Sequence, residues 1–561
     1  MSGRGRSVPA WAREELALRD EMKRWTEEAA ARQQGWPWLG VHDEGSFLNS
    51  WFGFYVLTGD REVRDHLYYV RDGYRTWAET RMHHGYYPEG EAHHEIETYV
   101  NYLANYWQLD EDRDTDLGIV EDVAHHVGNW VSGIPEWYDW KGHRFRSYWL
   151  GTREVRDYPP CDIERPDHAR FVRLCINAYL GSGKDRYLEL VADYAKTWSR
   201  IILEETADHV PPFVRFPVSH VDRIAEVYFP DAWNLPDEAM HYGSEKPGVM
   251  GGAWAGFYQA ATAERGFKDA FPYWAKWGTD WEGHRSGYGV ALGRMYEVVR
   301  SLTEAGVVMG EERYKEAARR MIELAETLGA GCAAGWMAEY RAATKETRYD
   351  KALSGALAHP YHRPTAMVLE GMALPHPTLR WAYRDGKGRM CDYDGPSAGA
   401  LVTDYQLRGD PEALARAFEM ARGQLHIARR TLRDGREHGC VGYYIQGPGG
   451  QAGGALNAAV MGLYTFACMD RRVVRYTRRD GTGGLPEGVA AAYRPLNVNR
   501  LHVRLYNGNQ EETTLGVRPD DMDLKVSDAR VDGAPHYDLT PREVMVQVSP
   551  EREMEVEIEL G

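Results

Sequence analysis

The feature of the sequence that most constrains its fold is a short turn that recurs between two stretches with helical spacing of apolar residues. In most copies a glycine ends the first stretch and an acidic residue opens the second. Glycine adopts a positive φ at a helix C-terminus at little cost, and aspartate caps the next helix. The pattern therefore predicts a series of helical hairpins, whose turns lie within residues 54–63, 107–114, 178–188, 263–269, 308–314 and 405–414.

The two helices of each predicted hairpin differ in composition. The leading helices are rich in Gly, Ala, Asn and aromatic residues. The trailing helices carry Arg, Glu and Lys along one face, as solvent-facing helices do. We therefore expect an inner and an outer ring of helices. The inner helices are predicted near residues 47–57, 94–108, 168–180, 250–264, 287–304, 396–408 and 453–467. The outer helices are predicted near 61–78, 113–131, 185–203, 311–328 and 411–432, with a charged N-terminal helix near 11–31 closing the outer ring.

The C-terminal region follows a different pattern. After a Gly-rich stretch at 480–488, apolar and polar residues alternate, as they do in half-buried strands. The alternating apolar residues are Leu501, Val503, Leu505, Val544, Val546, Val548, Met554, Val556, Ile558 and Leu560, and Asp532 with Gly533 forms a predicted hairpin turn. The sequence therefore predicts a mainly α chain: an α/α toroid of about six or seven helical hairpins. The toroid is expected to span 1–477, a linker 478–497, and a small antiparallel β-sandwich 498–561.

The connections between hairpins are long and contain most of the unusual polar and aromatic residues. In a ring of hairpins they would all emerge at one end, beside the N-termini of the inner helices. Long polar loops on one face of a rigid scaffold are where function is expected. These connections are residues 35–44, 83–95, 137–168, 231–242, 385–397 and 438–450.

The charge balance and the cysteines limit the partners and the compartment. The 561 residues include 67 basic and 84 acidic side chains, a net charge of −17, which argues against a nucleic-acid or anionic-membrane partner. No N-terminal stretch has the character of a signal peptide, and the longest apolar run, 455–469, is too short to span a bilayer. The six cysteines show no Cys-x-x-Cys spacing. We therefore expect a cytoplasmic protein with reduced thiols, and a homo-oligomer stays open.

The recurrent turn between helices resembles that of the α/α-toroid carbohydrate-active enzymes. These include unsaturated glucuronyl hydrolases, other α/α-barrel glycosidases, sugar 2-epimerases, and heparinase- and alginate-type lyases. The resemblance covers about residues 40–470, and several such enzymes carry an appended β-sandwich. It implies the toroid fold and a carbohydrate substrate. It assigns no catalytic residue, because no one family's catalytic signature aligns with this chain.

The densest group of candidate catalytic residues lies at the predicted start of an inner helix. It comprises Glu91, His93, His94 and Glu95. A carboxyl group there could transfer protons while the imidazoles bind sugar hydroxyls. His93, His94 and Glu97 could instead bind a divalent metal, a weaker alternative because the pattern is not His-Glu-x-x-His. No other cofactor is expected. A purely structural alternative is that these carboxylates stabilise the helix N-terminus by interacting with the helix dipole.

Glycoside hydrolysis requires a second carboxyl group, about 5–9.5 Å from the first. The candidates in other long loops are Asp392 with Asp394, Asp237 with Glu238, and Asp43 with Glu44, and Asp43 is also a predicted substrate-binding residue. Each alone is more often a cap or turn residue. Because acidic groups dominate the predicted loops, hydrolysis of an oligo- or polysaccharide is the first functional expectation.

A polysaccharide lyase is the second expectation, since elimination beside a uronate carboxylate needs a Tyr or His base and a cation. His241 with Tyr242, or Asp392 with Tyr393, could supply the base. Arg144 and Arg146, or Arg153 and Arg156, could bind the carboxylate. An ordinary solvated loop with ion pairs explains the arginines equally well. Sugar epimerisation by paired histidines and a non-catalytic carbohydrate-binding scaffold stay open as further alternatives.

Aromatic residues in the same loops would suit either chemistry. The chain has 19 Trp and 35 Tyr but only 13 Phe, and Trp and Tyr combine an apolar face with a polar edge. Sugar rings stack on such faces. The predicted platforms are Trp36, Trp38, Trp137, Trp140, Trp149 and Trp233, and Tyr393 is a further predicted substrate-binding residue.

Overall fold

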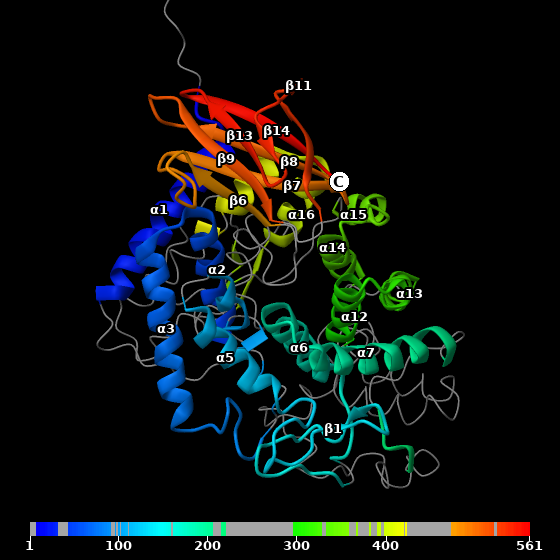
Figure 1. Cartoon of the computed structure of the whole chain (residues 1–561). Coiled ribbons are helices and arrows are strands. Elements are labelled where there is room, and N and C mark those ends of the chain that lie inside the picture. The colour runs from blue at the N-terminus through cyan, green and yellow to red at the C-terminus, as the bar shows by residue number, and fades with distance from the viewer. Residues whose placement is uncertain are drawn as a thin grey trace, which may run out of the picture. The chain divides into compact units, whose positions relative to one another are not determined.

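The structure, a computed structural model, consists of two compact units (Figure 1). Unit 1 contains Met1–Trp77 and Lys345–Gly561, and unit 2 contains Ala78–Thr344. The structure describes residues 7–31, 43–90, 92, 96, 99–100, 103–109, 112–158, 161–205, 215–219, 295–327, 333–357, 366–367, 381–382, 390–393, 398–419, 421–422, 473–520 and 524–561. The inner helices expected at 250–264 and 453–467 lie outside these residues.

The helices of unit 1 confirm the predicted turn chemistry. α2 ends at Thr58, Gly59 has a φ of +62°, and the Asp60 carboxylate accepts the backbone N–H of Glu62 at 2.9 Å. Gly409 repeats this conformation with a φ of +74°. The helices are α1 (Ala10–Ala31), α2 (Asp43–Thr58), α3 (Arg61–Glu79, which runs to the boundary of the unit), α15 (Asp350–Leu357) and α16 (Ala398–Arg408).

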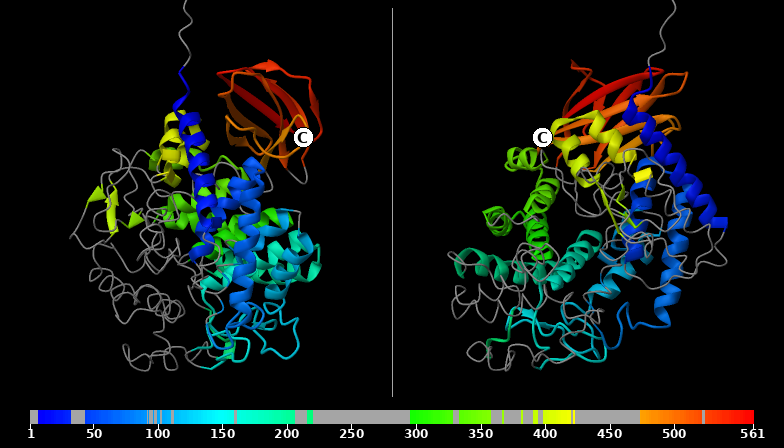
Figure 2. Two further views of the ribbon diagram at one scale, coloured as in Figure 1. Left: turned by 90° about the vertical axis from the view of Figure 1, so that its left-hand side faces the viewer. Right: turned by 180° about the vertical axis from the view of Figure 1, so that it is seen from behind.

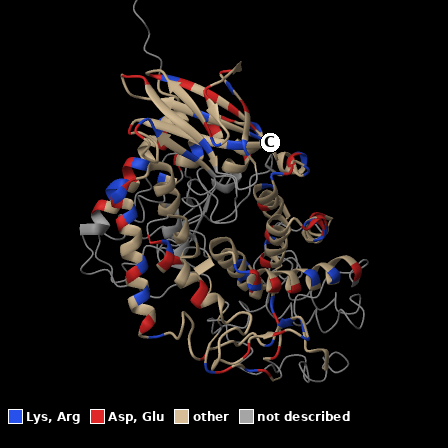
Figure 3. Cartoon of the chain, viewed as in Figure 1, with Lys and Arg blue, Asp and Glu red and all other residues tan. Residues whose placement is uncertain are grey.

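Unit 2 contains two of the predicted hairpins, α6–α7 and α12–α13, which pack against each other. α6 packs against α12, while α7 packs against α13. Gly183 (φ +71°) and Gly310 (φ +69°) form the turns, as predicted. Charged residues recur along α7, and along α3 of unit 1, as expected for the trailing helices (Figure 3). The elements are η2 (Leu103–Leu109), α5 (Arg113–Ala124), β1 (Tyr138–Asp139), β2 (Arg144–Phe145), η3 (Pro166–His168), α6 (Ala169–Ser182), α7 (Asp185–Arg200), η4 (Ile201–Glu205), α12 (Tyr296–Met309), α13 (Glu312–Thr327) and α14 (Ala333–Thr344).

The leading helices α6 and α12 are parallel and begin at the same end of unit 2. Arg170 in the first turn of α6 pairs with Glu297 in the first turn of α12 at 3.0 Å, and Arg173 pairs with Glu304, farther along both helices, at 2.9 Å. The Ser301 hydroxyl also donates to the Ala169 carbonyl at 2.8 Å. The segment 137–168 leads directly into this end, since α6 follows it.

The C-terminal region forms two antiparallel sheets that pack face to face (Figure 2). One sheet has the order β11-β10-β14-β8-β7 and the other β12-β13-β9-β6. Apolar residues at alternate positions of β13 and β14 are buried, as their patterning predicts. The strands are β6 (Val473–Arg478), β7 (Val489–Asn497), β8 (Arg500–Asn507), β9 (Thr513–Asp520), β10 (Val526–Val531), β11 (Ala534–Pro535), β12 (Leu539–Thr540), β13 (Glu543–Val548) and β14 (Arg552–Leu560).

The sheet region begins earlier than the sequence indicates. β6 begins at Val473, within the segment 1–477 that was expected to be toroid, and β7 occupies the second half of the segment 478–497 that was expected to be a linker. A further small sheet in unit 1, which the sequence did not predict, has the order β3-β5-β4. Its strands are β3 (Ala366–Met367), β4 (Trp381–Ala382) and β5 (Met390–Tyr393).

Polar contacts fix the sheets to the helices of unit 1. β7 packs against α1 and α16. The Trp11 indole N–H donates to Glu553 at 2.9 Å, and the Arg494 guanidinium donates to the Leu407 carbonyl at 3.3 Å. Arg478 donates to the Thr58 carbonyl at 3.2 Å, so the turn between α2 and α3 is held against the sheets. The sheet region is therefore an integral part of unit 1.

Within the part of the chain that the structure describes, no helix has the length and apolar character needed to cross a membrane.

Candidate functional site

Two of the long connections, 83–95 and 137–168, meet in unit 2. The backbone N–H of Ala92 donates to the Leu150 carbonyl at 3.3 Å, and the N–H of Thr152 donates to the Tyr87 carbonyl at 3.2 Å. The N–H of Arg153 donates to the Pro88 carbonyl at 2.9 Å. The predicted convergence of the long loops is therefore confirmed for these two connections. We call this region, residues 83–90 and 92 together with 145–158, the loop junction.

Asn129 fixes the start of the longer connection. Its side-chain oxygen accepts the backbone N–H groups of Trp137 (2.8 Å) and Tyr138 (3.1 Å), and its amide donates to the Tyr138 carbonyl at 2.7 Å. Asn129 itself has a φ of +64°, a conformation that asparagine tolerates better than most residues. The side chain thus replaces the backbone partners that a regular strand would supply.

The middle of the connection is held by α7 and by a buried carboxylate. Tyr138 donates to Asp193 of α7 at 2.6 Å, and His143 pairs with the same carboxylate at 2.7 Å. Glu164 is fully buried, accepts the N–H of Phe145 at 2.9 Å and pairs with Arg215 at 3.2 Å. Burial raises the pKa of Glu164 despite this cation. These contacts make the connection a rigid support for the loop junction.

The shorter connection begins with a tight turn that contains two histidines. His83 and Tyr86 exchange backbone hydrogen bonds, and His84 and Gly85 between them have φ values of +52° and +82°. Both central residues thus have the positive φ of a type I′ turn. The His84 ring pairs with Asp122 of α5 at 2.7 Å and lies beside the buried ring of His126, with ring centroids 5.4 Å apart.

His126 belongs to the interior beneath this turn. The pKa of His126 is lowered to about 3, mainly by burial. The neighbouring rings of His84, His83 and His125 lower it further. Neither ring nitrogen of His126 has a hydrogen-bond partner among the described residues. Within the same residues, no three or more His, Cys, Asp and Glu side chains are grouped so that they could hold a metal ion. His126 is therefore neutral and acts as a packing residue.

Two of the predicted binding residues make structural contacts. Trp137 has no exposed surface; its N–H donates to the Gly151 carbonyl at 3.1 Å and its ring packs edge-on against Tyr86. Arg144 is buried and donates to the carbonyls of Phe145 (2.7 Å) and Asp162 (3.3 Å). The roles of Trp137 in sugar binding and of Arg144 in carboxylate binding stay predictions. The burial of both side chains argues against these roles.

Two further predicted binding residues, Arg146 and Trp149, are partly exposed at the junction. Arg146 lies between two carboxylates, at 2.6 Å from Glu136 and 3.2 Å from Asp157. Trp149 is partly exposed, and the Arg156 guanidinium lies over its ring, 4.2 Å from the centroid. The ion pairs of Arg146 match the ordinary solvated loop that the sequence left open.

Most of the remaining predicted site residues lie outside the described residues. Asp43 and Glu44 begin α2, and Asp392 and Tyr393 lie in β5, which places their backbones only. The residues outside are Trp36, Trp38, Glu91, His93, His94, Glu95, Glu97, Trp233, Asp237, Glu238, His241, Tyr242 and Asp394. Their roles therefore stay predictions.

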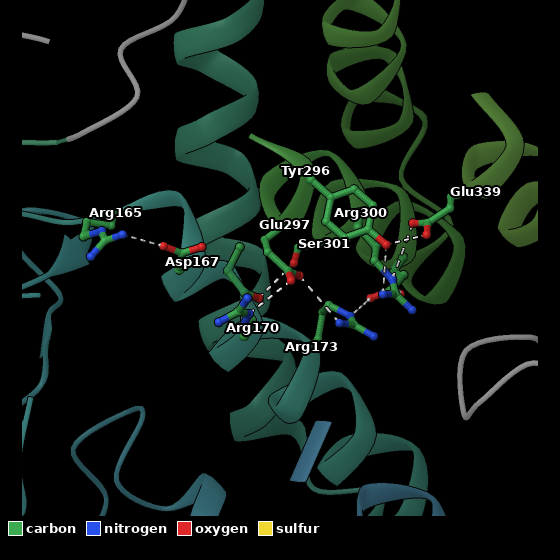
Figure 4. A network of polar contacts seen from close by, with 11 residues as sticks. Arg165, Asp167, Arg170, Arg173, Tyr296, Glu297, Arg300, Ser301 and Glu339 are labelled. Atoms are coloured by element: carbon green, nitrogen blue, oxygen red, sulfur yellow. Dashed lines mark hydrogen bonds and ion pairs between the residues drawn. The ribbon is translucent and has the colours of Figure 1, made fainter. Parts of the chain in front are cut away.

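A chain of ion pairs that sequence analysis missed runs across the starts of α6 and α12 (Figure 4). Arg173 is 2% exposed and pairs with Glu297 (3.6 Å) and Glu304 (2.9 Å), while Arg170 pairs with Glu297 on the other side. Burial alone would raise the pKa of Glu297, but Arg170 and Arg173 outweigh it and lower the pKa. The only available sequence signal was charge on helices expected to be inner: Arg170, Arg173, Glu297, Arg300 and Glu304.

The comparisons with known proteins differ in what they find. No protein-family model and no curated protein matches the chain. Among solved structures it is similar to a GH127 β-L-arabinofuranosidase from Geobacillus stearothermophilus T6, with a TM-score of 0.28 and 10% sequence identity. The match covers 99% of this chain and 81% of that chain. At this TM-score the likeness decides neither the fold nor the function.

Proposed function

We propose that the chain is a carbohydrate-active enzyme with an α/α toroid, and that it hydrolyses glycosidic bonds of an oligo- or polysaccharide. The observation that carries this proposal is the loop junction at the end of unit 2 where α6 and α12 begin. Two long connections, one acidic and one rich in Arg and Trp, meet there through the Ala92–Leu150 hydrogen bond. Catalytic residues are commonly held on loops in this way by a rigid scaffold.

The acidic connection supplies the chemistry of hydrolysis. Hydrolysis uses one carboxyl group to protonate the leaving oxygen and another to activate water or attack the sugar. Ala92 lies in the sequence between Glu91 and the pair Glu95 and Glu97. Its contact with Leu150 therefore supports the prediction that Glu91 and Glu95 act beside the Trp149 loop.

The other connection suggests an acidic sugar. Arg153 is anchored through its backbone to Pro88, but its side chain is 73% exposed. Its only carboxylate partner among the described residues is Glu89 at 3.5 Å, itself 53% exposed. An exposed guanidinium with such a loose partner can bind the carboxylate of a uronate through two hydrogen bonds. We therefore favour a uronic-acid-containing glycan, with Trp149 beside it.

The same arginine supports the second candidate function, a polysaccharide lyase. Elimination needs a cation to neutralise the uronate carboxylate while a base removes the neighbouring proton. Arg153 could provide the cation, and the expected base is Tyr242 or His241. A non-catalytic carbohydrate-binding scaffold would use the same surface without turnover.

Product analysis on a panel of neutral and uronate-containing glycans tests these functions. Hydrolysis yields new reducing ends without the ultraviolet absorbance of an unsaturated uronate, whereas elimination yields both. Binding without turnover would establish the scaffold. We expect Glu91→Gln or Glu95→Gln to lower kcat by about 100-fold or more. The matched control is Glu312→Gln, which removes a 62% exposed carboxylate on the trailing helix α13. Unchanged rates in both test variants would refute the assignment of this acidic connection.

A further inference from the structure

The turn of the β1–β2 hairpin in unit 2 exposes side chains that the proposed function does not use. It lies between the paired residues Asp139 and Arg144. Trp140 is 37% exposed, and the neighbouring Lys141 and His143 are exposed as well. A single exposed indole ring is ordinary at a protein surface. What distinguishes this turn is that its surroundings hold the indole and the imidazole in place.

Two tryptophan rings of this region are fixed on the same residue, Gly128. The Trp140 indole N–H donates to the Gly128 carbonyl at 3.4 Å, and the Trp140 ring meets that of Tyr138 edge-on, with centroids 5.1 Å apart. The Trp130 ring lies so close to Gly128 that a Cβ added to the glycine would be 2.3 Å from it. Trp130 is partly exposed. Both indole rings are therefore held beside Gly128, and solvent reaches both residues.

The basic side chains around these rings lie along α7. Nδ1 of His143 pairs with the Asp193 carboxylate at 2.7 Å, and the side chain is 52% exposed, so Nε2 is left without a partner among the described residues. The Arg186 guanidinium lies over the Trp130 ring, 5.8 Å from its centroid. Arg186 and Asp193 are two helical turns apart in α7 and therefore share one face of that helix. The hairpin turn and Trp130 thus lie along the same face of α7.

Two cations of this surface pair with no carboxylate among the described residues. The Arg186 guanidinium lies over the rings of Trp130 and Tyr187. Lys141 is exposed, and its one hydrogen bond within the same residues runs from its backbone N–H to Asp139 at 3.1 Å. Cations without acidic partners attract an anionic ligand, and a guanidinium binds a carboxylate through two hydrogen bonds. The aromatic rings beside them favour a ligand that has apolar faces, as sugar rings do.

We propose that the surface formed by Trp130, Trp140, Lys141, His143 and Arg186, the hairpin surface, binds an acidic glycan in addition to the loop junction; the choice of a glycan rests on the proposed function. Sugar rings stack on the two indoles, and uronate carboxylates pair with Lys141 and Arg186. Nε2 of His143 binds a sugar hydroxyl. Nucleic acid would offer bases to the same rings and phosphates to the same cations, but the net charge of −17 opposes it.

The hairpin surface and the long part of the loop junction belong to the same connection, residues 137–168. A polymer bound at the hairpin surface is therefore tethered to the connection that also carries Trp149. Tethering raises the effective concentration at which the rest of the polymer meets the loop junction. The hairpin surface thus serves a long substrate more than a short one.

The test measures binding of the full chain to polygalacturonate and to alginate, two uronate polymers, with neutral dextran and a single-stranded DNA oligonucleotide as comparisons. Titration calorimetry in about 0.15 M salt, which screens weak nonspecific attraction, gives the Kd. We expect Trp140→Ala to weaken uronate binding by about tenfold or more, and Lys141→Glu by about fivefold or more. The controls Tyr537→Ala and Lys351→Glu remove an exposed aromatic ring and reverse an exposed lysine charge in unit 1, and their Kd should stay within about twofold of the wild type.

The outcomes separate this surface from the proposed function. Lys141→Glu changes an exposed side chain, so it keeps the test valid even if circular dichroism shows that Trp140→Ala fails to fold. Unchanged uronate affinity in folded Lys141→Glu would overturn the hairpin surface. So would a wild type that binds neither uronate polymer, that binds dextran equally well, or that binds the DNA more tightly. Weakened binding in the variants without cleavage of any glycan by the wild type would leave the hairpin surface standing and overturn the hydrolase.

Discussion

Gly151 faces the carbonyl oxygen of Pro88 so closely that a Cβ added to Gly151 would lie 2.3 Å from that oxygen. Real Cβ atoms are not found at such a distance from an oxygen, so any side chain at residue 151 would separate the two connections. The contact lies at the centre of the loop junction, where the N–H of Arg153 also donates to Pro88. Gly151 is thus the residue that allows the two backbones to meet.

We predict that Gly151→Ala destabilises unit 2 by about 1–3 kcal/mol, because the obstructing atom is backbone and cannot move aside alone. Gly118→Ala is the matched control: it lies in α5, and an added Cβ meets nothing within 4 Å. Alanine in a helix should stabilise by about 0.5–1 kcal/mol there. Urea unfolding measures both changes, and equal effects of the two variants would contradict the close approach.

The stability of unit 2 should fall in mild acid because His126 is buried. The pKa of His126 is about 6.5 in an unfolded chain and about 3 in the folded one. Between these values only the unfolded state binds the proton, so the stabilising contribution is present above pH 6.5 and is lost as the pH falls toward 3. The loss is about 1.4 kcal/mol per pH unit for this one histidine.

His126→Phe, which keeps an aromatic ring in the same space, should reduce the pH dependence of unfolding over that window. The exposed His143→Gln variant serves as the control. Urea unfolding at a series of pH values measures the slope in each case. A slope in His126→Phe identical to that of the wild type would show that His126 accepts a proton without unfolding.

Removing the charge of Arg173 alone should lower the free energy of unfolding more than removing it together with a partner carboxylate. Arg173→Met leaves the buried carboxylates of Glu297 and Glu304 without their shared cation, and we expect a loss of about 3–5 kcal/mol. Adding Glu304→Gln removes a buried negative charge for which only Arg300 remains as a cation, and should recover part of the loss. Arg313→Met, which breaks an exposed pair with Glu204, should cost less than about 1 kcal/mol. Equal losses in the two single variants, measured by urea unfolding, would show that burial of the pair has no special cost.

Features that depend on local chemistry were predictable from the sequence. The turns at Gly59, Gly183, Gly310 and Gly409 follow from the conformational freedom of glycine, and all four have a positive φ. The hairpin turn at Asp532 and Gly533 is confirmed in the same way, with φ values of +50° and +80°. The strand patterning of β13 and β14 follows from one buried face, whereas β8, whose apolar residues also alternate in the sequence, is buried on both faces along most of its length.

Features without a local signal were missed. α14 was not predicted, because the residue with positive φ that ends it is Lys345 and not a glycine. β7 was assigned to a linker, since its first five residues, from Val489 to Tyr493, are all buried and therefore do not alternate. The charges of Arg173 and Glu304 become partners only through the packing of α6 on α12, which no spacing within one segment reveals.

Unit 1 is formed by two segments that are far apart in the sequence, which has a consequence for biosynthesis. Its two parts are Met1–Trp77 and Lys345–Gly561, so the whole of unit 2 is translated between them. Trp11 of α1 donates a hydrogen bond to Glu553 of β14, a strand that is synthesised only after the whole of unit 2. During elongation the N-terminal helix must wait with its sheet-facing side uncovered, a period in which chaperones can bind it. Unit 1 therefore cannot be completed until all of unit 2 has been synthesised, while unit 2 can fold on the emerging chain.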